Sequence, residues 1–450
     1  MLSKVLIANR GEIALRIART CRELDIPTVA VYSSADEDSP VVRYADEAVC
    51  IGPPPSRNSY ANPAAIVEAA LQTGADAVHP GYGFLSEDPD FAEICHANDL
   101  VFVGPEPDVL ARLGDKATAR EAAVAAGLRV LPGSAEPESN PIAAERLAND
   151  IGFPVIIKAV AGGGGRGMTV VREPGDFRAA FTLTKANAQG VFGDGRVYVE
   201  RYLDAARHVE VQVLADQYGH VVHLGTRDCS VQRRRQKLIE ESPAFGLPAE
   251  MTERMGRAAA EAARASGYTG AGTYEFLVDD DRDFFFMEVN CRIQVEHPVT
   301  EMITGIDLVR EQLLVAAGIP LGLRQEDVKL QGAAMECRIN AEDPNRDFLP
   351  TAGTITEFEP PGGPFTRVDT HLRQGLAIPP YYDPMVAKAI VWAPDRDQVL
   401  ARMDRALSEF RIAGPGVATT TGFLREVLAY PSFRHGKHTT ALVDQLLARI

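Results

Sequence analysis

Short apolar runs alternate with amphipathic segments along the first 115 residues. The runs have the length of buried strands, and the segments between them place apolar residues at helical spacing, as Ile13, Ile17 and Leu24 do. Strands are predicted at residues 4–8, 28–32, 77–79 and 101–104, and helices at residues 11–24, 63–73 and 89–97. This alternation predicts a parallel sheet with helices on both faces. The first turn holds a single glycine, Gly11, and so lacks a dinucleotide fingerprint.

The pattern changes beyond residue 115. A mostly helical stretch to residue 150 is followed by β-type runs that look antiparallel, and the last part of the chain is mixed. The runs that look antiparallel are 196–202, 208–214 and 221–224, with a further pair at 270–278 and 284–289. Later helices are predicted within 300–317, 397–410 and 417–429, and strands at 334–340, 353–358 and 385–392.

Five glycines lie within six positions, between the β-type runs 153–159 and 168–171. Consecutive glycines let a backbone approach a ligand closely and turn its N–H groups toward phosphate oxygens. A dinucleotide fingerprint needs a helix after the loop, whereas a strand follows here. The arrangement therefore favours a hairpin flap that closes over a nucleotide, with a plain flexible surface loop as the alternative.

Two lysines are candidates for nucleotide phosphates. Lys158 ends an apolar run just before the glycine loop, where an unpaired charge is costly, so a phosphate is a natural partner. The alternative is a lysine at a sheet edge whose ammonium reaches solvent. Lys116 on its own has the pattern of a surface residue at a helix start.

Two glutamates are embedded in the strand pair that ends near residue 290. Antiparallel pairing can bring Glu275 and Glu288 side by side, with Asn290 on the same face as Glu288. Such oxygen clusters suit Mg²⁺ or Mn²⁺ that bridges nucleotide phosphates. The alternative is that each glutamate faces solvent from an edge strand.

Polar residues continue at every second position beyond Asn290. If the strand continues, Arg292, Gln294 and Glu296 share the face of Glu288, which is either a wet sheet face or an active-site wall. Arg292 could bind a small oxyanion, and Glu296 could deprotonate it. Residues 232–237 and Arg338 add basic groups that favour an anion site, with a solvated basic patch as the alternative.

The charge balance and the cysteines limit the class of protein. The net charge of −16 argues against duplex nucleic acid as the main partner. The six cysteines are scattered without a C-x-x-C pair, which favours a reducing compartment. No apolar stretch approaches the ~20 residues of a membrane span, and the first residues do not have the pattern of a signal peptide. We expect a cytoplasmic protein that binds neither nucleic acid nor membrane.

In combination, eight motifs carry a family resemblance along essentially the whole chain. The chain resembles the biotin carboxylase subunit of bacterial acyl-CoA carboxylases. The motifs are IANRGEIA (7–14), HPGYGFLSE (79–87), GDK (114–116), AGGGGRG (161–167), RDCS (227–230), RIQVEHPVTEMIT (292–304), ECRINAED (336–343) and PYYDPM (380–385). The resemblance implies an α/β (α+β) ATP-grasp protein. Its expected parts are a Rossmann-like domain over 1–115, an ATP-grasp domain over 116–332 with a mobile lid at about 131–203, and a mixed α+β C-terminal domain over 333–450.

The resemblance also implies a role for each matching residue. ATP would be held by Lys116, Lys158, Gly164, Gly165, Glu200, Arg201, Tyr202, Leu203, His208, Gln232, Arg235, Glu275 and Glu288. Glu275, Glu288 and Asn290 would hold Mg²⁺ or Mn²⁺, two ions being expected. Lys237, Arg292, Gln294 and Val295 would bind bicarbonate, Glu296 would be its base, and Tyr82 and Arg338 would face biotin. The catalytic set is then Lys237, Arg292, Glu296 and Arg338.

Two positions depart from the family pattern. Arg235 stands where members commonly carry histidine, so its contact with the phosphates is expected to differ. Cys291 replaces a common threonine and, by alternation, points away from the polar face, so little effect is expected.

The implied reaction is carboxylation of biotin by ATP and bicarbonate through carboxyphosphate. Residues 1–450 contain no biotin-attachment motif, so the carrier and the carboxyltransferase are expected on other chains, with this chain as a homodimer. The expected assembly is an acyl-CoA carboxylase, with acetyl-CoA and fatty acid biosynthesis favoured, although propionyl-CoA and pyruvate enzymes share this half-reaction. The rival hypotheses are another ATP-grasp ligase that passes an acyl phosphate to an amine, and a nucleotide-binding regulatory module without turnover.

Overall fold

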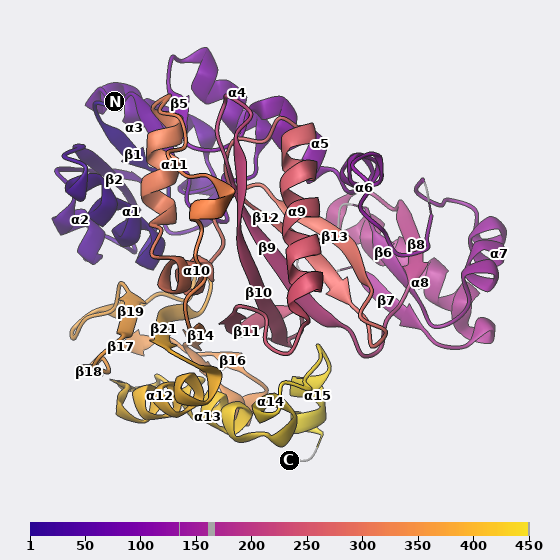
Figure 1. Cartoon of the computed structure of the whole chain (residues 1–450). Coiled ribbons are helices and arrows are strands. Elements are labelled where there is room, and N and C mark those ends of the chain that lie inside the picture. Colours follow the sequence, from indigo (N-terminus) through magenta and orange to yellow (C-terminus); the bar gives the residue numbers. More distant parts are fainter. Residues whose placement is uncertain (135, 161–166, 449–450) are drawn as a thin grey trace.

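The computed structural model describes residues 1–134, 136–160 and 167–448, and its first part is a parallel sheet covered by helices (Figure 1). The strand order is β3-β2-β1-β4-β5, and every pair is parallel. The strands are β1 (Val5–Ile7), β2 (Thr28–Ser33), β3 (Glu47–Gly52), β4 (Ala77–His79) and β5 (Val101–Phe102). The helices are α1 (Gly11–Glu23), α2 (Pro40–Tyr44), α3 (Pro63–Thr73), α4 (Pro89–Ala97) and α5 (Pro107–Gly114). The predicted Rossmann-like arrangement is confirmed, and it gains the unpredicted edge strand β3, which is largely exposed.

An eight-stranded antiparallel sheet forms the centre of the molecule. Its strand order is β13-β12-β9-β10-β11-β14-β21-β19. The strands are β9 (Arg207–Ala215), β10 (Val221–Arg233), β11 (Gln236–Ser242), β12 (Gly270–Val278), β13 (Phe284–Asn290), β14 (Ala333–Asn340), β19 (Thr366–Thr370) and β21 (Met385–Ala393). Three helices accompany it: α9 (Ala249–Ala265), α10 (His297–Thr304) and α11 (Leu308–Ala316). The sheet therefore joins strands from before residue 290 to strands from after residue 333 by direct β11–β14 pairing.

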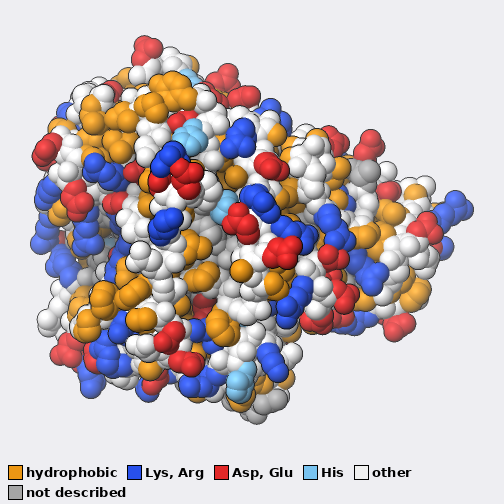
Figure 2. All heavy atoms as spheres, in the orientation of Figure 1, with side chains coloured by type: hydrophobic (Ala, Val, Ile, Leu, Met, Phe, Trp, Pro, Cys, Tyr) orange, Lys and Arg blue, Asp and Glu red, His pale blue; other side chains and the backbone are white. Residues whose placement is uncertain are grey.

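A small unit projects from this body at the right of Figures 1 and 2. It has a three-stranded antiparallel sheet in the order β7-β6-β8 and a hydrophobic cluster of its own. Its elements are α7 (Pro141–Ile151), β6 (Val155–Ala159), β7 (Met168–Val171), α8 (Phe177–Phe192) and β8 (Val197–Arg201), and α6 (Lys116–Ala125) precedes it. The hairpin predicted around the glycine loop is present, with Lys158 opposite Met168, and the loop itself, residues 161–166, lies outside the described residues.

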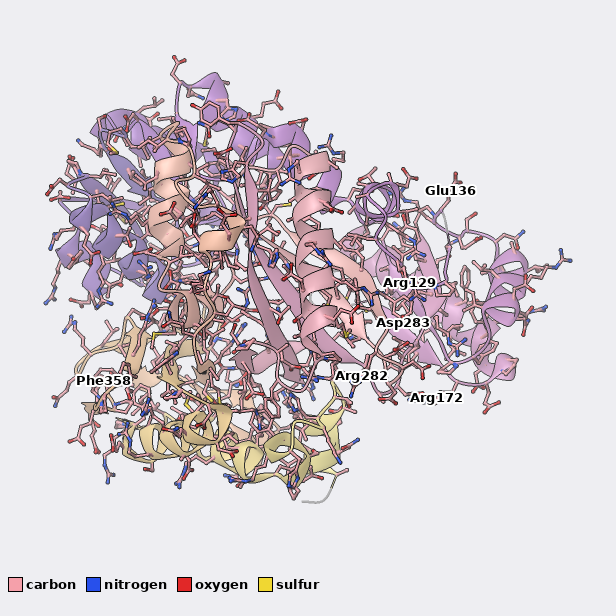
Figure 3. The ribbon with its side chains drawn as sticks, in the orientation of Figure 1. Arg129, Glu136, Arg172, Arg282, Asp283 and Phe358 are labelled. Carbon is pink, nitrogen blue, oxygen red and sulfur yellow. The ribbon has the colours of Figure 1, made fainter. Side chains whose placement is uncertain are left out.

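The prediction that residues 196–202 form one antiparallel group with residues 208–214 and 221–224 was wrong. β8 pairs with β6 in the small sheet, whereas β9 lies in the large one. Alternation alone predicts a strand but not its partner, which packing decides. Arg129 lies at the junction of the two sheets: its Nη1 is 2.6 Å from Asp283 Oδ1, and its carbonyl accepts from Phe286 N on β13 (Figure 3).

The C-terminal part closes one end of the large sheet with helices and short strands. Its helices are α12 (Arg396–Glu409), α13 (Thr421–Ala429), α14 (Pro431–Arg434) and α15 (Leu442–Leu447). The short strands are β15 (Glu342–Asp343), β16 (Leu349–Pro350), β17 (Gly353–Thr354), β18 (Glu357–Glu359), β20 (Ala377–Ile378) and β22 (Arg411–Ala413). The single strand predicted over 353–358 is wrong, because the backbone changes partner there: Ile355 N donates to Leu376 O and Thr356 N to Ala413 O. Acidic and basic side chains are interspersed over the face in Figure 2.

In the described residues, no helix is both long and apolar enough to cross a membrane.

The central sheet predicts a large difference between two leucines. Leu214 on β9 is fully buried, whereas Leu183 on α8 is 60% exposed. We expect Leu214→Ala to lower the free energy of unfolding by about 2–5 kcal/mol, through lost burial and a residual cavity. Leu183→Ala should change it by less than about 0.5 kcal/mol. Denaturant unfolding of both variants checks this, and equal losses would contradict the described packing.

Candidate active site

The register of β12 and β13 places the predicted acid pair side by side. Glu275 lies opposite Glu288, and Thr273 lies opposite Asn290. Glu275 is buried and Glu288 is half-buried, and Asn290 Nδ2 donates to Glu275 Oε1 at 2.8 Å. Burial raises the pKa of Glu288, and the charge of Glu275 adds to the rise. The two antiparallel strands thus bring two carboxylates and an amide to one place, as the residue pattern predicted.

The ammonium of Lys237 contacts three carboxylates, one of which is Glu275 of this pair. Its Nζ lies 2.7 Å from Glu210, 2.9 Å from Glu275 and 2.6 Å from Glu296. Burial alone would lower the pKa of Lys237, but the surrounding anions, Glu210, Glu275 and Glu296 among them, raise it well above its ordinary value. The ammonium is therefore a fixed positive charge in the floor of the site.

Residues 291–296 are not a continuation of β13, so the argument from strand alternation was wrong there. The strand ends at Asn290, and a turn leads into α10 at His297. The polar side chains still gather, because the turn directs them back toward the end of β13. Gln294 Nε2 donates to Glu275 Oε1 at 3.1 Å. Cys291 is buried among apolar residues, away from this group.

The guanidinium of Arg292 is fixed on three sides. It donates to Glu87 Oε2 at 2.9 Å, to Gln294 Oε1 at 2.8 Å and to Asn290 Oδ1 at 3.1 Å. The backbone N–H of Cys291 donates to the other oxygen of Glu87. A rigid fork of donors beside Gln294 is suited to a small planar anion.

Glu296 has no exposed surface and lies between two cations. Lys237 Nζ is 2.6 Å from its Oε1, and Arg338 Nη2 is 2.9 Å from its Oε2. Burial alone would raise the pKa of Glu296, but Lys237 and then Arg338 hold it well below its ordinary value. The carboxylate of Glu296 is therefore ionised, with one oxygen against each of these two cations. The carbonyl of Val295 accepts from Lys388 Nζ at 2.8 Å, which fixes the turn before Glu296.

Tyr82 lies near Arg338, at the edge of this group. Its hydroxyl donates to Glu12 Oε1, and burial raises the pKa of Tyr82 well above its ordinary value, with the Glu12 charge adding to the rise. The charge of Arg338 lowers the pKa of Tyr82 and so opposes that rise, which requires the two side chains to lie close to each other. The two residues predicted to face biotin, Tyr82 and Arg338, are therefore in the same part of the site.

The small sheet brings two further predicted residues together. Lys158 on β6 forms an ion pair with Glu200 on β8, and Arg120 Nη1 lies 3.4 Å from the other Glu200 oxygen. Lys116 is the first residue of α6. Burial lowers the pKa of Lys116; the negative charge of Glu288 opposes this shift, and the positive charge of Lys158 adds to it. Lys116 therefore lies between the carboxylate pair on the large sheet and Lys158 on the small one.

The remaining nucleotide candidates differ in what they contact. Arg201 Nη1 donates to the carbonyl of Ile151, and Tyr202 N donates to Pro154 O, so both residues structure the strand end. Leu203 follows them in the turn after β8 and is half-buried. Gly164 and Gly165 lie outside the described residues.

His208 and Gln232 line the other side of Glu275. His208 Nε2 lies 2.7 Å from Glu275 Oε2, and Gln232 Nε2 lies 3.3 Å from His208 Nδ1. Burial alone would lower the pKa of His208, but Glu275 raises it. Arg235 lies in the tight turn between β10 and β11, at a positive φ of 67°, beside Met168 of the small sheet.

The basic run 232–237 divides between two environments. Arg233 and Arg234 form ion pairs with Asp347, whereas Lys237 is directed into the site. The run is therefore neither a solvated patch nor an anion site throughout.

Several side chains of the site were missed by sequence reasoning: Glu12, Glu87, Glu210, Glu240 and Lys388. Glu210 had a usable signal, since His208, Glu210 and Gln212 alternate along one strand. Glu12 and Glu87 lie within the motifs 7–14 and 79–87, which marked their segments but not their contacts. The partners of Glu240 and Lys388 come from distant segments that no local pattern relates.

A divalent cation fits best at Glu275, Glu288 and Asn290. Among the described residues, two groups of His, Cys, Asp or Glu have ligand atoms within 4.8 Å of one another: His208, Glu210 and Glu275, and Glu210, Cys229 and Glu296. Lys237 already places its ammonium against Glu210, Glu275 and Glu296, so a second cation within either of these groups would meet repulsion. A cation between Glu275 and Glu288 would instead offset the repulsion between two neighbouring carboxylates.

This fold and arrangement define an ATP-grasp ligase. Three family models match the chain: biotin carboxylase N-terminal domain at residues 1–110, carbamoyl-phosphate synthase L chain ATP-binding domain at 115–324, and biotin carboxylase C-terminal domain at 336–445. Biotin carboxylase 1 of Bacillus subtilis is 53% identical over 445 residues, which cover 99% of this chain and 98% of that protein.

Two solved structures are similar over nearly the whole chain. A biotin carboxylase–β-γ-ATP complex from Campylobacter jejuni has a TM-score of 0.96 and 46% identity, covering 99% of both chains. The biotin carboxylase domain dimer of the Hydrogenobacter thermophilus 2-oxoglutarate carboxylase, in complex with MgADP and bicarbonate, has a TM-score of 0.95 and 45% identity, covering 99% of this chain and 98% of that one. The chain belongs to the biotin carboxylase family, and the resemblance inferred from its motifs is confirmed.

Removal of the Lys237 ammonium should destabilise the protein in a pH-dependent way. In the intact protein the lowered pKa of Glu296 contributes stability above its ordinary value of 4.5. Lys237→Met removes the first of the two cations that hold this pKa down while Arg338 remains, so the variant should lose much of that stability at pH values above 4.5. We expect a loss of about 3–5 kcal/mol near neutral pH and a smaller loss near pH 5. Denaturant unfolding at both pH values checks this, with the exposed Lys437→Met as control; a pH-independent loss would contradict it.

Proposed function

We propose that this chain uses MgATP and bicarbonate to carboxylate biotin that is attached to a separate carrier protein. The observation that carries the proposal is the position of Glu296, a fully buried carboxylate between Lys237 and Arg338 beside the fork of Arg292. A base, an anion cradle and a nucleotide-facing acid pair within one group match the needs of bicarbonate activation by ATP. The ATP, Mg²⁺ and bicarbonate in the two similar solved structures support the same assignment.

The nucleotide would lie between the two sheets. Lys116 and Lys158 would neutralise its phosphates, and the glycine loop with Gly164 and Gly165 would close over them. Further contacts would come from Glu200, Arg201, Tyr202, Leu203, His208, Gln232 and Arg235. Glu275, Glu288 and Asn290 would hold two Mg²⁺ or Mn²⁺ ions, which when bound supply charge neutralisation on the phosphates.

The bicarbonate step follows from the fixed charges. Arg292, Gln294, Lys237 and the Val295 backbone would orient the anion. Glu296 would take its proton, and the resulting oxygen would attack the γ-phosphoryl group to form carboxyphosphate. That compound breaks down to CO₂ and phosphate, and the phosphate would take the proton from the ureido nitrogen of biotin.

The biotin end of the site would be formed by Arg338 and Tyr82. As the ureido nitrogen loses its proton, negative charge develops on the ureido oxygen. The Arg338 guanidinium would stabilise this charge, and the nitrogen would then attack CO₂ to give carboxybiotin. Tyr82 is fixed by Glu12 and would form the adjacent wall.

The proposal also covers the molecule that finally accepts the carboxyl group and the assembly in which the chain acts. We assign the chain to the first half-reaction of an acyl-CoA carboxylase, with acetyl-CoA as acceptor, acting as a homodimer with a carrier and a carboxyltransferase on other chains. The dimeric 2-oxoglutarate carboxylase domain supports the homodimer and also shows that the same fold serves another acceptor in that enzyme.

The half-reaction is tested by ATP hydrolysis of the purified chain. We expect hydrolysis that needs bicarbonate and Mg²⁺ and that free biotin stimulates. Glu296→Gln keeps the shape of the side chain but removes the base, so the biotin-stimulated rate should fall by about 10²-fold or more. Hydrolysis that is indifferent to both biotin and bicarbonate would overturn the function, and transfer to amine acceptors would then be measured.

The acceptor is tested with purified carrier and carboxyltransferase from the same source. We expect labelled bicarbonate to appear in malonyl-CoA when acetyl-CoA is supplied, and not in products of propionyl-CoA, pyruvate or 2-oxoglutarate. Transfer to a keto acid instead would reject acetyl-CoA and leave the half-reaction intact.

A further inference from the structure

Two buried glutamates lie directly behind Arg338, and the proposed mechanism uses neither. Glu240 on β11 and Glu336 on β14 are opposite each other in the antiparallel register, and neither has exposed surface. Directly opposed residues have Cβ atoms about 5 Å apart and side chains on one face. Arg338 lies two residues beyond Glu336 on the same strand, and its Nε is 2.6 Å from Glu240 Oε1.

Three of the four oxygens in this pair have no hydrogen-bond partner among the described residues. They are Glu240 Oε2 and both carboxyl oxygens of Glu336. An ionised carboxylate so placed would lose its solvation without replacement, which is costly in a buried site. A carboxyl group that keeps its proton avoids most of that cost.

The cations that face the pair are already bound to other anions. Arg338 also binds Glu296, and Lys388 Nζ lies 2.9 Å from Glu12 and 3.9 Å from Asp369. The charged groups that act directly on the pair are Lys237 from β11, Arg338 from β14, Lys388 from β21 and Glu296 from the turn before α10, and the thiols of Cys229 on β10 and Cys337 on β14 also lie close enough to interact with it. Glu12 from α1 and Asp369 from β19 act through Lys388.

The anions in this group outnumber the cations. The three cations Lys237, Arg338 and Lys388 are already paired: Lys237 binds Glu210, Glu275 and Glu296, Arg338 binds Glu296, and Lys388 binds Glu12, whereas Asp369 is held by Arg367. Two adjacent buried carboxyls with so little compensation cannot both ionise near neutral pH. Burial raises the pKa of Glu240 to about 7, with Arg338 opposing and Glu296 adding to the rise. Burial also raises the pKa of Glu336 well above its ordinary value, against the effect of Lys388.

We propose that Glu240 and Glu336 share one proton and act as positioning residues that set, through Arg338, how strongly the base Glu296 is held. This inference rests on the proposed function, in which Glu296 accepts the proton of bicarbonate. With its proton, the pair contributes one negative charge, and Arg338 is free to bind Glu296 firmly. When the proton is released to solvent, the second negative charge competes for Arg338 and repels the ionised Glu296. The basicity of Glu296 therefore rises.

The pH profile of the bicarbonate-dependent ATPase tests the inference. Between about pH 6 and pH 9, the wild type should show a rise of about tenfold in kcat/KM for bicarbonate, as the basicity of Glu296 increases. In the double variant Glu240→Gln/Glu336→Gln neither position can take up or release a proton, so the rise should disappear. Glu326→Gln, an exposed glutamate on the segment Gln325–Asp327, should keep the wild-type profile.

Infrared spectroscopy of the ligand-free protein gives a readout independent of turnover. We expect a buried carboxylic acid band at about pH 6 that loses intensity near neutral pH. The band should be absent from the double variant Glu240→Gln/Glu336→Gln and present in Glu326→Gln. Each replacement keeps the shape of the side chain without its charge, and far-ultraviolet circular dichroism would check that the variants fold.

The two measurements separate the two proposals. A wild type with bicarbonate-dependent ATPase and a Glu240→Gln/Glu336→Gln variant with the same pH profile would overturn the positioning role and leave the function intact. A wild type without that ATPase would overturn the function and with it the positioning role, and the infrared band would then decide whether the pair shares a proton. A missing band in the wild type would overturn the shared proton in either case.

Discussion

The structure depends on keeping Glu296 ionised in a place where water does not reach. A bare carboxylate without exposed surface would take up a proton, because burial disfavours the charged form. Lys237 and Arg338 prevent this, and they come from β11 and β14, two adjacent strands of one sheet. The large sheet must therefore run without interruption from the strands before residue 290 into those after residue 333. The buried carboxylate of Glu296 thereby ties together regions that look separable along the chain.

The same constraint explains why so many other charges are buried nearby. Each cation that faces Glu296 has to be balanced, because a buried charge is tolerated only with close partners. Lys237 binds Glu210 and Glu275, Arg338 binds Glu240, and Lys388 binds Glu12 while it holds the Val295 carbonyl. The chain of partners extends from the parallel sheet to the C-terminal strands, so a change at one member alters the charge balance of the others.

The small sheet is built differently, with its own apolar cluster around Phe177 and Phe181. Its contribution to the site is made by the Lys158–Glu200 pair, which faces the large sheet across Lys116. A separate core lets such a unit keep its internal packing while its position relative to the body changes. This suits the proposed lid, and the residues proposed to bind the nucleotide are correspondingly divided between the two sheets.

The sequence by itself determined the local features. The apolar alternation over residues 1–115 predicted the parallel sheet, the runs on either side of the glycines predicted a hairpin, and the paired strands predicted Glu275 beside Glu288. Each of these depends on residue period or on neighbours close in the chain, which a sequence displays directly. The motifs carried the family resemblance in the same way, because they are short and contiguous.

Only the tertiary structure decided which distant strands meet. Strand alternation failed for residues 292–296, since the backbone turns there and contacts to Glu275, Glu87 and Lys237 gather the side chains instead. It failed for β8, whose partner is β6. The pairing of Glu240 with Glu336 and the reach of Lys388 to Val295 have no signal in the order of residues. Such contacts are set by sheet register and burial over long separations, and these also determine which carboxyl groups in the site keep a proton.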